Sequence, residues 1–133
     1  MEIIRAKTAG FCMGVSLALC KLDQALTEEK TGRVVTLGPI IHNPQVIADY
    51  ARRGVVEVND LTELRPGDRV LIRAHGIPKE MEEALVQAGV EIVDATCPKV
   101  KKAQENIAEM CSAGLTLILF GEAEHPEVRG LLS

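Results

Sequence analysis

Aromatic residues are scarce in this chain of 133 residues. It contains no tryptophan, one tyrosine and two phenylalanines, so aromatic residues make up only 2% of the sequence. Apolar residues nevertheless make up 47%, which is enough for the core of one ordinary domain. This core must be built from valine, isoleucine, leucine and alanine, a composition typical of buried parallel strands covered by helices.

Positive charge is not in excess either. The 15 lysines and arginines are outnumbered by 19 aspartates and glutamates, which gives a net charge of −4. A general nucleic-acid-binding protein normally carries a basic surface, so we expect no nucleic-acid partner. No apolar run is long enough to span a bilayer, and the charged residues Glu2, Arg5 and Lys7 interrupt any signal-peptide pattern. We therefore expect a cytoplasmic protein with no membrane partner.

The chain also lacks closely spaced cysteine pairs. The four cysteines, Cys12, Cys20, Cys97 and Cys111, form no CxxC pair, which argues against a zinc ribbon and against a thioredoxin-like motif. A reducing compartment also disfavours structural disulfides. Three interpretations of such widely spaced cysteines stay open: core residues, a catalytic nucleophile, or metal ligands that the fold brings together.

Short aliphatic runs alternate with amphipathic segments along the chain. We predict strands at 2–6, 33–37, 55–58, 69–74, 90–93 and 115–120. We predict helices at about 15–26, after Pro44, at about 81–88, after Pro98 and after Pro126. This alternation predicts an α/β fold with mostly parallel sheets flanked by helices. No element follows the last predicted helix, so we interpret the chain as the front part of a longer protein.

The three histidines share one position in this pattern. His42, His75 and His125 each follow a predicted strand and precede a predicted helix. In open α/β sheets, ligands bind at this edge, beyond the carboxyl ends of the strands. Each histidine alone fits equally well as a helix cap or a turn residue, but the repetition favours function for the set. Imidazole groups and helix N-termini both bind phosphate, so we expect a phosphorylated ligand.

Two of the cysteines also share a setting. Cys12 lies in Ala9-Gly10-Phe11-Cys12-Met13-Gly14, and Cys97 lies in Asp94-Ala95-Thr96-Cys97-Pro98. Each precedes a predicted helix, and a helix N-terminus favours the thiolate form, which attacks substrates and binds metals. The alternative is that both are small buried core residues. Loops rich in glycine and proline are poor candidates for core positions, so we favour a chemical role for this pair.

Cys20, Cys111 and Glu127 have plainer interpretations. Cys20 and Cys111 lie inside predicted helices. Cys111 falls on an apolar stripe and is expected in the core, whereas Cys20 lies off the main stripe; we assign neither a chemical role. Glu127 follows His125-Pro126 in the first turn of a helix. There it either favours the helix dipole or, near a metal and a leaving hydroxyl group, acts as a proton donor.

Five short motifs occur in the order found in a known family. Ala9-Gly10-Phe11-Cys12-Met13-Gly14-Val15, Ile41-His42-Asn43, Ala74-His75-Gly76, Asp94-Ala95-Thr96-Cys97-Pro98 and His125-Pro126-Glu127 resemble the motif series of the 4-hydroxy-3-methylbut-2-enyl diphosphate reductases. Each motif is moderately specific, but five in order with compatible spacing are highly specific. The resemblance covers nearly the whole chain.

The resemblance implies an iron–sulfur oxidoreductase that catalyses the last step of the non-mevalonate isoprenoid pathway. Members of this family carry out the reductive dehydroxylation of 4-hydroxy-3-methylbut-2-enyl diphosphate, an allylic diphosphate. The products are isopentenyl and dimethylallyl diphosphate. The resemblance also implies ferredoxin or flavodoxin as the electron donor.

The same resemblance implies roles for six residues. Cys12 and Cys97 match two of the three cysteine ligands of a [4Fe–4S] cluster. A cluster with a missing fourth thiolate has an open iron position that suits binding of the substrate hydroxyl group. Contacts with the substrate, largely its diphosphate, are implied for His42, His75 and His125. The acid of a proton relay is implied at Glu127.

The resemblance further implies a fold of three similar α/β domains around a central cluster. We expect residues 1–13 to form an N-terminal strand and cluster-binding loop, 14–97 the first α/β domain, and 98–133 the start of the second domain. The third cysteine ligand and further substrate residues lie in the later part of the family pattern, beyond Ser133. We therefore expect this chain alone to be inactive and unable to hold a stable cluster.

Two other functions stay open from the residues alone. A Cys/His zinc-binding domain would use Cys12, Cys97 and some of the histidines, although their spacing is not that of a common zinc motif. A non-catalytic α/β phosphate-binding module would bind its ligand independently of both cysteines, but the chain has neither a GxGxxG nor a P-loop sequence. Metal analysis and visible absorption separate zinc, which is colourless, from an iron–sulfur cluster, which is brown.

Overall fold

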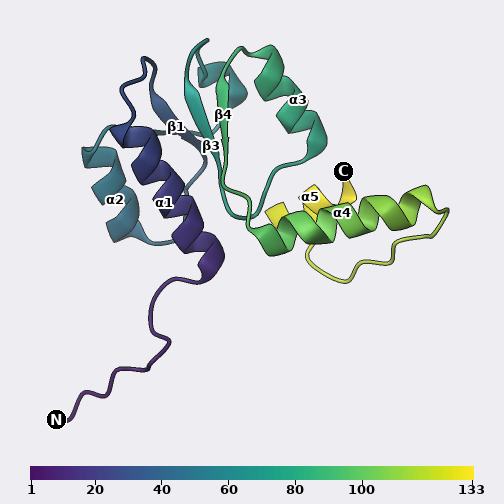
Figure 1. Ribbon diagram of the computed structural model, residues 1–133, viewed down its shortest axis with the longest axis horizontal. Coiled ribbons are helices and arrows are strands. Elements are labelled where there is room, and N and C mark those ends of the chain that lie inside the picture. The colour runs from purple at the N-terminus through teal and green to yellow at the C-terminus, as the bar shows by residue number, and fades with distance from the viewer.

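A four-stranded parallel sheet forms the centre of the molecule (Figure 1). The computed structural model describes residues 1–133. The strands are β1 (Val34–Leu37), β2 (Val55–Val58), β3 (Arg69–Ile72) and β4 (Glu91–Asp94). They are arranged in the order β2-β1-β3-β4, and all neighbours run parallel. The predicted α/β fold with a parallel sheet is therefore confirmed.

Helices cover both faces of this sheet. They are α1 (Met13–Thr27), α2 (Pro44–Arg52), α3 (Lys79–Gln87), α4 (Pro98–Ser112) and α5 (Pro126–Leu132), with a short 3-10 helix η1 (Leu61–Glu63). Helices α1 and α2 lie on one face and α3 lies on the other, whereas α4 and α5 pack against each other beyond the carboxyl end of β4 (Figure 1). None of the helices is both long and apolar enough to cross a bilayer.

The core has two halves, one on each face of the sheet. Successive side chains of a strand point to opposite faces. On one face, Leu71 of β3 packs in a cluster with Leu22 of α1. On the other face, Val35 of β1 and Val70 of β3 pack with Leu85 of α3. The central strands are therefore buried on both sides, which explains why an aliphatic composition suffices.

Prolines fix the start of three helices. Pro44, Pro98 and Pro126 lie in the first turn of α2, α4 and α5. Proline is favoured there because the first N–H groups of a helix have no intrahelical acceptor and its φ angle already suits a helix. The residues before the last two prolines, Cys97 and His125, are therefore helix N-caps.

The sheet has a topological switch between β1 and β3. The chain leaves β1 through α2 to reach β2 on one side, and then crosses to β3 on the other side of β1. Such a switch opens a crevice at the carboxyl ends of the two central strands. His42 follows β1 and His75 follows β3, so both histidines lie at the edge that the sequence indicates.

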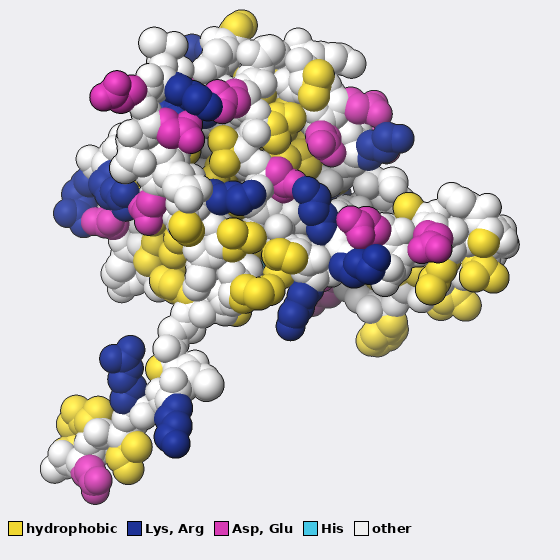
Figure 2. Space-filling model, viewed as in Figure 1, with side chains coloured by type: hydrophobic (Ala, Val, Ile, Leu, Met, Phe, Trp, Pro, Cys, Tyr) yellow, Lys and Arg dark blue, Asp and Glu magenta, His cyan; other side chains and the backbone are white.

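Two predicted strands are absent. Residues 1–6 form no strand and extend away from the body of the molecule (Figure 1), with Ile3 and Ile4 more than four-fifths exposed. Residues 115–120 also form no strand, and Ile118 and Phe120 are almost fully exposed. Figure 2 shows the hydrophobic side chains that remain uncovered on the N-terminal tail and at the far end of α4. Both predictions are wrong because a strand needs a neighbour for its backbone hydrogen bonds, and neither segment has one.

Cys111 is another correction. It lies in α4 as predicted but is exposed, not part of the core. Val100 is the only buried residue of α4. The apolar face of the helix, including Ile107 and Cys111, borders an open cavity of about 490 Å³ that no element fills.

The domain boundaries expected at residues 13 and 97 stay a prediction.

Adjacent residues of α3 provide a test of the core. Leu85 is 0% exposed and Val86 is 64% exposed. Leu85→Ala removes buried contacts and leaves a cavity, so we expect the free energy of unfolding to fall by about 2–5 kcal/mol. Val86→Ala should change it by less than about 0.5 kcal/mol. Urea titrations followed by circular dichroism measure both variants, and equal losses would contradict the assigned buried face of α3.

Candidate functional site

Cys12 and Cys97 each begin a helix. Cys12 is the N-cap of α1 and Cys97 is the N-cap of α4. Neither thiol is hydrogen-bonded to the first turn of its own helix, and neither is in a disulfide. Cys12 is exposed and Cys97 is partly buried. Both sulfur atoms are therefore free to bind a ligand beside N–H groups that have no intrahelical partner.

The backbone of Cys97 is fixed by the sheet. Beyond the last paired residues of β3 and β4, the Ala95 N–H donates to the Ile72 carbonyl at 2.9 Å, and the Cys97 N–H donates to the Ala74 carbonyl at 2.9 Å. These two bonds continue the parallel ladder into the loop before α4. The position of Cys97 therefore follows from the register of the sheet.

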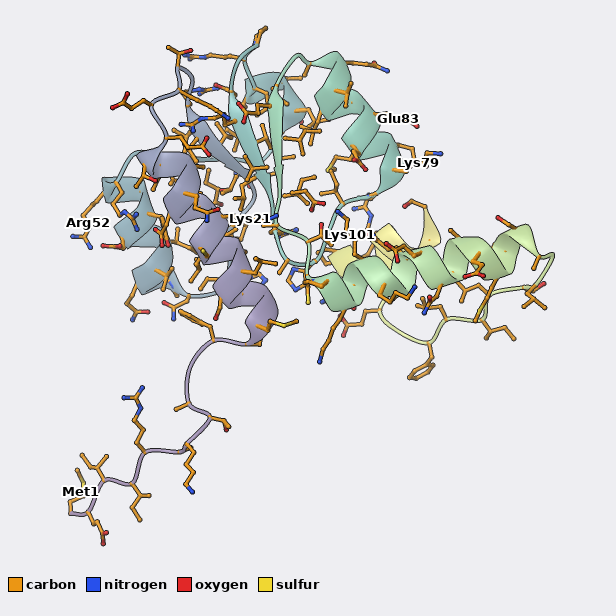
Figure 3. All side chains as sticks on the ribbon, in the orientation of Figure 1. Met1, Lys21, Arg52, Lys79, Glu83 and Lys101 are labelled. Atoms are coloured by element: carbon orange, nitrogen blue, oxygen red, sulfur yellow. The ribbon has the colours of Figure 1, made fainter.

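Asp94 holds the same loop through its side chain. Its Oδ1 accepts a hydrogen bond from the Thr96 N–H at 2.9 Å, and its carboxylate pairs with Lys101 of α4. Lys21 of α1 donates to the Asp94 carbonyl, and Figure 3 shows both lysines near the end of β4. Burial acts to raise the pKa of Asp94, but the hydrogen bonds from Lys101 and Thr96 outweigh it and hold the pKa below its usual value. Asp94 is thus ionised at neutral pH and ties β4 to the first turn of α4.

The side chain of Cys97 lies against the start of α1. Gly14 is the second residue of that helix, directly after Met13 and two positions after Cys12. A Cβ atom at Gly14 would stand 3.0 Å from Cβ and 3.0 Å from Sγ of Cys97. The first turn of α1 is therefore in contact with the N-cap residue of α4, so the two helix starts that carry the predicted cysteines are neighbours.

His75 and His125 form a second pair. Their ring centroids are 5.5 Å apart with an interplanar angle of 82°, an edge-to-face arrangement. The His75 Nδ1 atom is buried and has no hydrogen-bond partner. Gly76, with φ of +73°, closes the turn after β3 by donating its N–H to the Arg73 carbonyl at 3.0 Å. The two imidazoles thus meet although they come from distant parts of the chain.

Glu127 lies next to this histidine pair. The N–H of Glu127 donates to Nδ1 of His125 at 3.3 Å, so that His125 caps α5. An imidazole that accepts at Nδ1 carries its proton on Nε2 when it is neutral. The N–H of His125 therefore lies on the side of the ring away from α5, where a ligand can accept it.

The electrostatics of His75 connect the remaining predicted residues. Burial lowers the pKa of His75, and the positive charges of Arg73, His125 and His42 lower it further, whereas the carboxylate of Glu127 opposes them. His42 is exposed at the end of β1 and is close enough for its charge to act on His75. The charges of His42, His125 and Glu127 thus all act on the imidazole of His75.

The cysteines and the histidines are neighbours. Ala74, which accepts from the Cys97 N–H, directly precedes His75. A Cβ at Gly76 would stand 3.3 Å from the Thr96 methyl group, so the turns after β3 and β4 pack together. The six predicted site residues thus collect at the carboxyl edge of the sheet. No three residues among the His, Cys, Asp and Glu side chains form a group that could hold a metal ion.

Three residues of the site were not found from the sequence. The role of Asp94 had a local signal, since an aspartate two residues before an N–H donor is a common turn pattern. Lys101 lies on the polar side of a predicted helix. Its ion pair with Asp94 crosses a loop, and no spacing of residues in the sequence indicates such a pair. Gly14 was noted only as a glycine beside Cys12, and its contact with Cys97 depends on the tertiary fold.

Comparison with known proteins gives a consistent set of relatives. A family model described as LytB protein matches residues 3–133. The whole chain is 64% identical over 133 residues to a protein of Nitratidesulfovibrio vulgaris (strain DSM 19637 / Miyazaki F) named 4-hydroxy-3-methylbut-2-enyl diphosphate reductase, and covers 47% of it. It is 61% identical over 138 residues to a protein of the same name from Desulfovibrio desulfuricans, of which it covers 48%. The chain thus spans about half the length of the curated relatives it matches.

Two solved structures resemble this one. The first is described as (E)-4-hydroxy-3-methyl-but-2-enyl diphosphate reductase, the terminal enzyme of the non-mevalonate pathway. It has a TM-score of 0.88 at 46% identity, and the match covers 98% of this chain and 46% of that chain. The second is E-1-hydroxy-2-methyl-but-2-enyl-4-diphosphate reductase from Plasmodium falciparum, with a TM-score of 0.87 at 28% identity, and the match covers 94% and 39% of the two chains.

The setting of His75 predicts a pH-dependent stability. Its pKa is lowered from 6.5 in the folded chain, so the unfolded chain is protonated first as the pH falls. Stability should therefore decrease from about pH 6.5 down to the folded pKa and then stop responding to this group. Urea unfolding at several pH values on either side of 6.5 measures the effect, and His75→Gln should remove it.

The exposed His42 supplies the matched control for this experiment, since His42→Gln should keep most of the contribution of His75, which comes mainly from burial. Proton NMR titration reads the folded imidazole directly. A His75 ring that takes up its proton above pH 6.5 would contradict the lowered pKa.

Proposed function

This chain belongs to the LytB protein family, and we propose that it forms the front half of a 4-hydroxy-3-methylbut-2-enyl diphosphate reductase. In the proposed reaction the allylic diphosphate takes up two electrons and two protons and loses its hydroxyl group as water. The products are isopentenyl and dimethylallyl diphosphate. The names of the relatives and the arrangement of the site residues support this proposal.

One contact carries the proposal. The side chain of Cys97 lies against Gly14 in the first turn of α1, the helix that Cys12 begins. The helix starts that carry the two cysteines come from distant parts of the chain and are neighbours. The histidine pair and Glu127 lie directly beside them. This combination fits a metal cluster next to a binding site for an anionic substrate.

The residues present fit part of a [4Fe–4S] cluster. Thiolates are the usual ligands of such clusters, and the missing Cβ of Gly14 leaves room for the Cys97 sulfur at the start of α1. We propose that Cys12 and Cys97 supply two ligands and that a third cysteine lies in the half of the family length that this chain does not span. When bound, the cluster supplies electrons one at a time and an iron atom that acts as a Lewis acid on the substrate hydroxyl group.

The histidines would hold the diphosphate of the substrate. His125 has its Nδ1 occupied by the Glu127 N–H, so its Nε2–H is available to a phosphate oxygen. The His75 ring, with its centroid 5.5 Å from that of His125, would offer a second hydrogen-bonding group to the same diphosphate. His42, which follows β1 and whose charge acts on His75, would add a third hydrogen-bonding group. Burial holds the pKa of His75 low, so His75 would act through hydrogen bonding and not through a fixed positive charge.

Glu127 is the proposed proton donor. Its carboxyl group lies in the first turn of α5, close enough to oppose the lowered pKa of His75. A carboxyl group beside the departing hydroxyl can supply the proton that turns it into water. The electron donor in this proposal is ferredoxin or flavodoxin. A cytoplasmic location agrees with four cysteines that are all free.

Serine variants of the four cysteines test the proposal. In a protein of the full family length, reconstituted anaerobically with iron and sulfide, Cys12→Ser and Cys97→Ser should abolish the brown absorption. They should also lower reductase activity by more than about 100-fold, since even loss of an outer-shell partner costs 10–100-fold. Cys20→Ser and Cys111→Ser change exposed thiols and serve as controls that should keep cluster and activity.

The chain of 133 residues should show no turnover after the same reconstitution, because it supplies only two ligands. Turnover comparable to that of the full-length protein would contradict this. A colourless protein that contains zinc would support the metal-site rival. Phosphate binding that is unaffected by both cysteine variants would support the non-catalytic module.

A further inference from the structure

Gly14 is the point at which the two cysteine-bearing helix starts touch. It is a buried residue in the first turn of α1. Glycine is a poor helix former compared with alanine. A glycine inside a helix is therefore best explained by close packing against residues of other elements. Gly10, on the other side of Cys12, has nothing within 4 Å of its missing Cβ. The reason for glycine at Gly14 must therefore lie in what surrounds it.

A side chain at Gly14 would be crowded by Cys97. A Cβ there would lie 3.0 Å from both Cβ and Sγ of Cys97 and 3.7 Å from Cβ of Ala74. Non-bonded carbon atoms pack best at about 3.5–4.0 Å. The contact with Cys97 is therefore tighter than ordinary packing, so alanine would need Cys97 to shift by a few tenths of an ångström, whereas the contact with Ala74 is an ordinary one. Cys97 is the residue that disfavours a side chain at this position.

Neither partner can easily move aside. The Cys97 backbone is tied to β3 through the Ala74 carbonyl at 2.9 Å, and the clash involves its Cβ, which moves with that backbone. Helix α1 is held by Ala18 and Leu22, both 0% exposed in the core. Rotation about the Cα–Cβ bond can carry the Cys97 sulfur away from α1, whereas relief of the 3.0 Å contact with the Cys97 Cβ needs a small shift of the Cys97 backbone.

We propose that Gly14 is a positioning residue that seats the Cys97 thiol against the first turn of α1, beside Cys12. The inference rests on the proposed function, because it gives Cys97 the role of a cluster ligand. An alanine at this position displaces the Cys97 side chain, both its Cβ and its sulfur, away from the first turn of α1. Gly14 thus determines whether two helix starts act as one ligand-binding unit.

A double-mutant cycle in the metal-free chain of 133 residues tests the contact between Gly14 and Cys97. Gly14→Ala should lower the thermal midpoint because of the clash with Cys97. In a Cys97→Gly background the clash is gone, and the same change should raise the midpoint because alanine favours the helix. Gly130→Ala is the matched control. Gly130 is also a buried helical glycine, and its added Cβ meets first the amide end of the Gln104 side chain at 3.4 Å, so its effect should be the same in both backgrounds.

The alkylation rate of the Cys97 thiol measures how exposed its sulfur atom is. A variant that keeps only Cys97 carries Cys12→Ser, Cys20→Ser and Cys111→Ser. Adding Gly14→Ala should increase its rate of alkylation by iodoacetamide several-fold, since the sulfur turns toward solvent, whereas Gly130→Ala should not change the rate. Equal midpoint shifts in both backgrounds, or an unchanged alkylation rate, would overturn the proposal.

Cluster loading separates failure of this inference from failure of the proposed function. After anaerobic reconstitution of the full-length protein, Gly14→Ala should lose most of the brown absorption, and Gly130→Ala should keep it. If the unmodified protein takes up no iron and sulfide, the proposed function fails, and the ligand-positioning role fails with it. If the unmodified protein and Gly14→Ala load the same amount of cluster, only the inference about Gly14 is wrong.

Discussion

Two backbone hydrogen bonds determine where the site residues lie. The N–H groups of Ala95 and Cys97 donate to the carbonyls of Ile72 and Ala74, so the pairing of β3 and β4 continues beyond both strands. His75 and Cys97 each lie three residues after the end of a strand and therefore arrive at the same level of the sheet edge. The positions of His75 and Cys97 therefore follow from the register of a rigid parallel sheet, because the loops after β3 and β4 continue the pairing of these two strands.

The sequence predicts well those parts of the site that depend on local signals. Pro98 and Pro126 mark helix starts, which places Cys97 and His125 as N-caps before any contact is known. The position of His75 after an aliphatic run likewise indicates the ligand-binding edge, and the family resemblance of the five motifs is confirmed. What the sequence cannot show is the contact between Gly14 and Cys97, because it joins residues far apart in the chain and exists only once α1 has packed on the sheet.

The incorrect predictions have one physical cause. Runs of apolar residues at 2–6 and 115–120 show that a segment suits a strand, but they do not show that a neighbouring strand is present to pair with it. Cys111 is similar, because an apolar stripe on α4 indicates a face that can be buried and not what covers it. Strands β1 to β4 were predicted correctly since each finds its partner within residues 34–94.

The uncovered apolar residues affect how the chain behaves at high concentration. Ile3 and Ile4 lie on the extended N-terminal tail, and Ile118 and Phe120 lie on the loop beneath α4, at a different end of the molecule (Figures 1 and 2). Two separate apolar surfaces on one molecule can contact two different neighbouring molecules at once. Unlike a single self-complementary patch, which closes into a dimer, such an arrangement extends into open, head-to-tail assemblies. Dilution and mild detergent are therefore the appropriate conditions for handling this chain by itself.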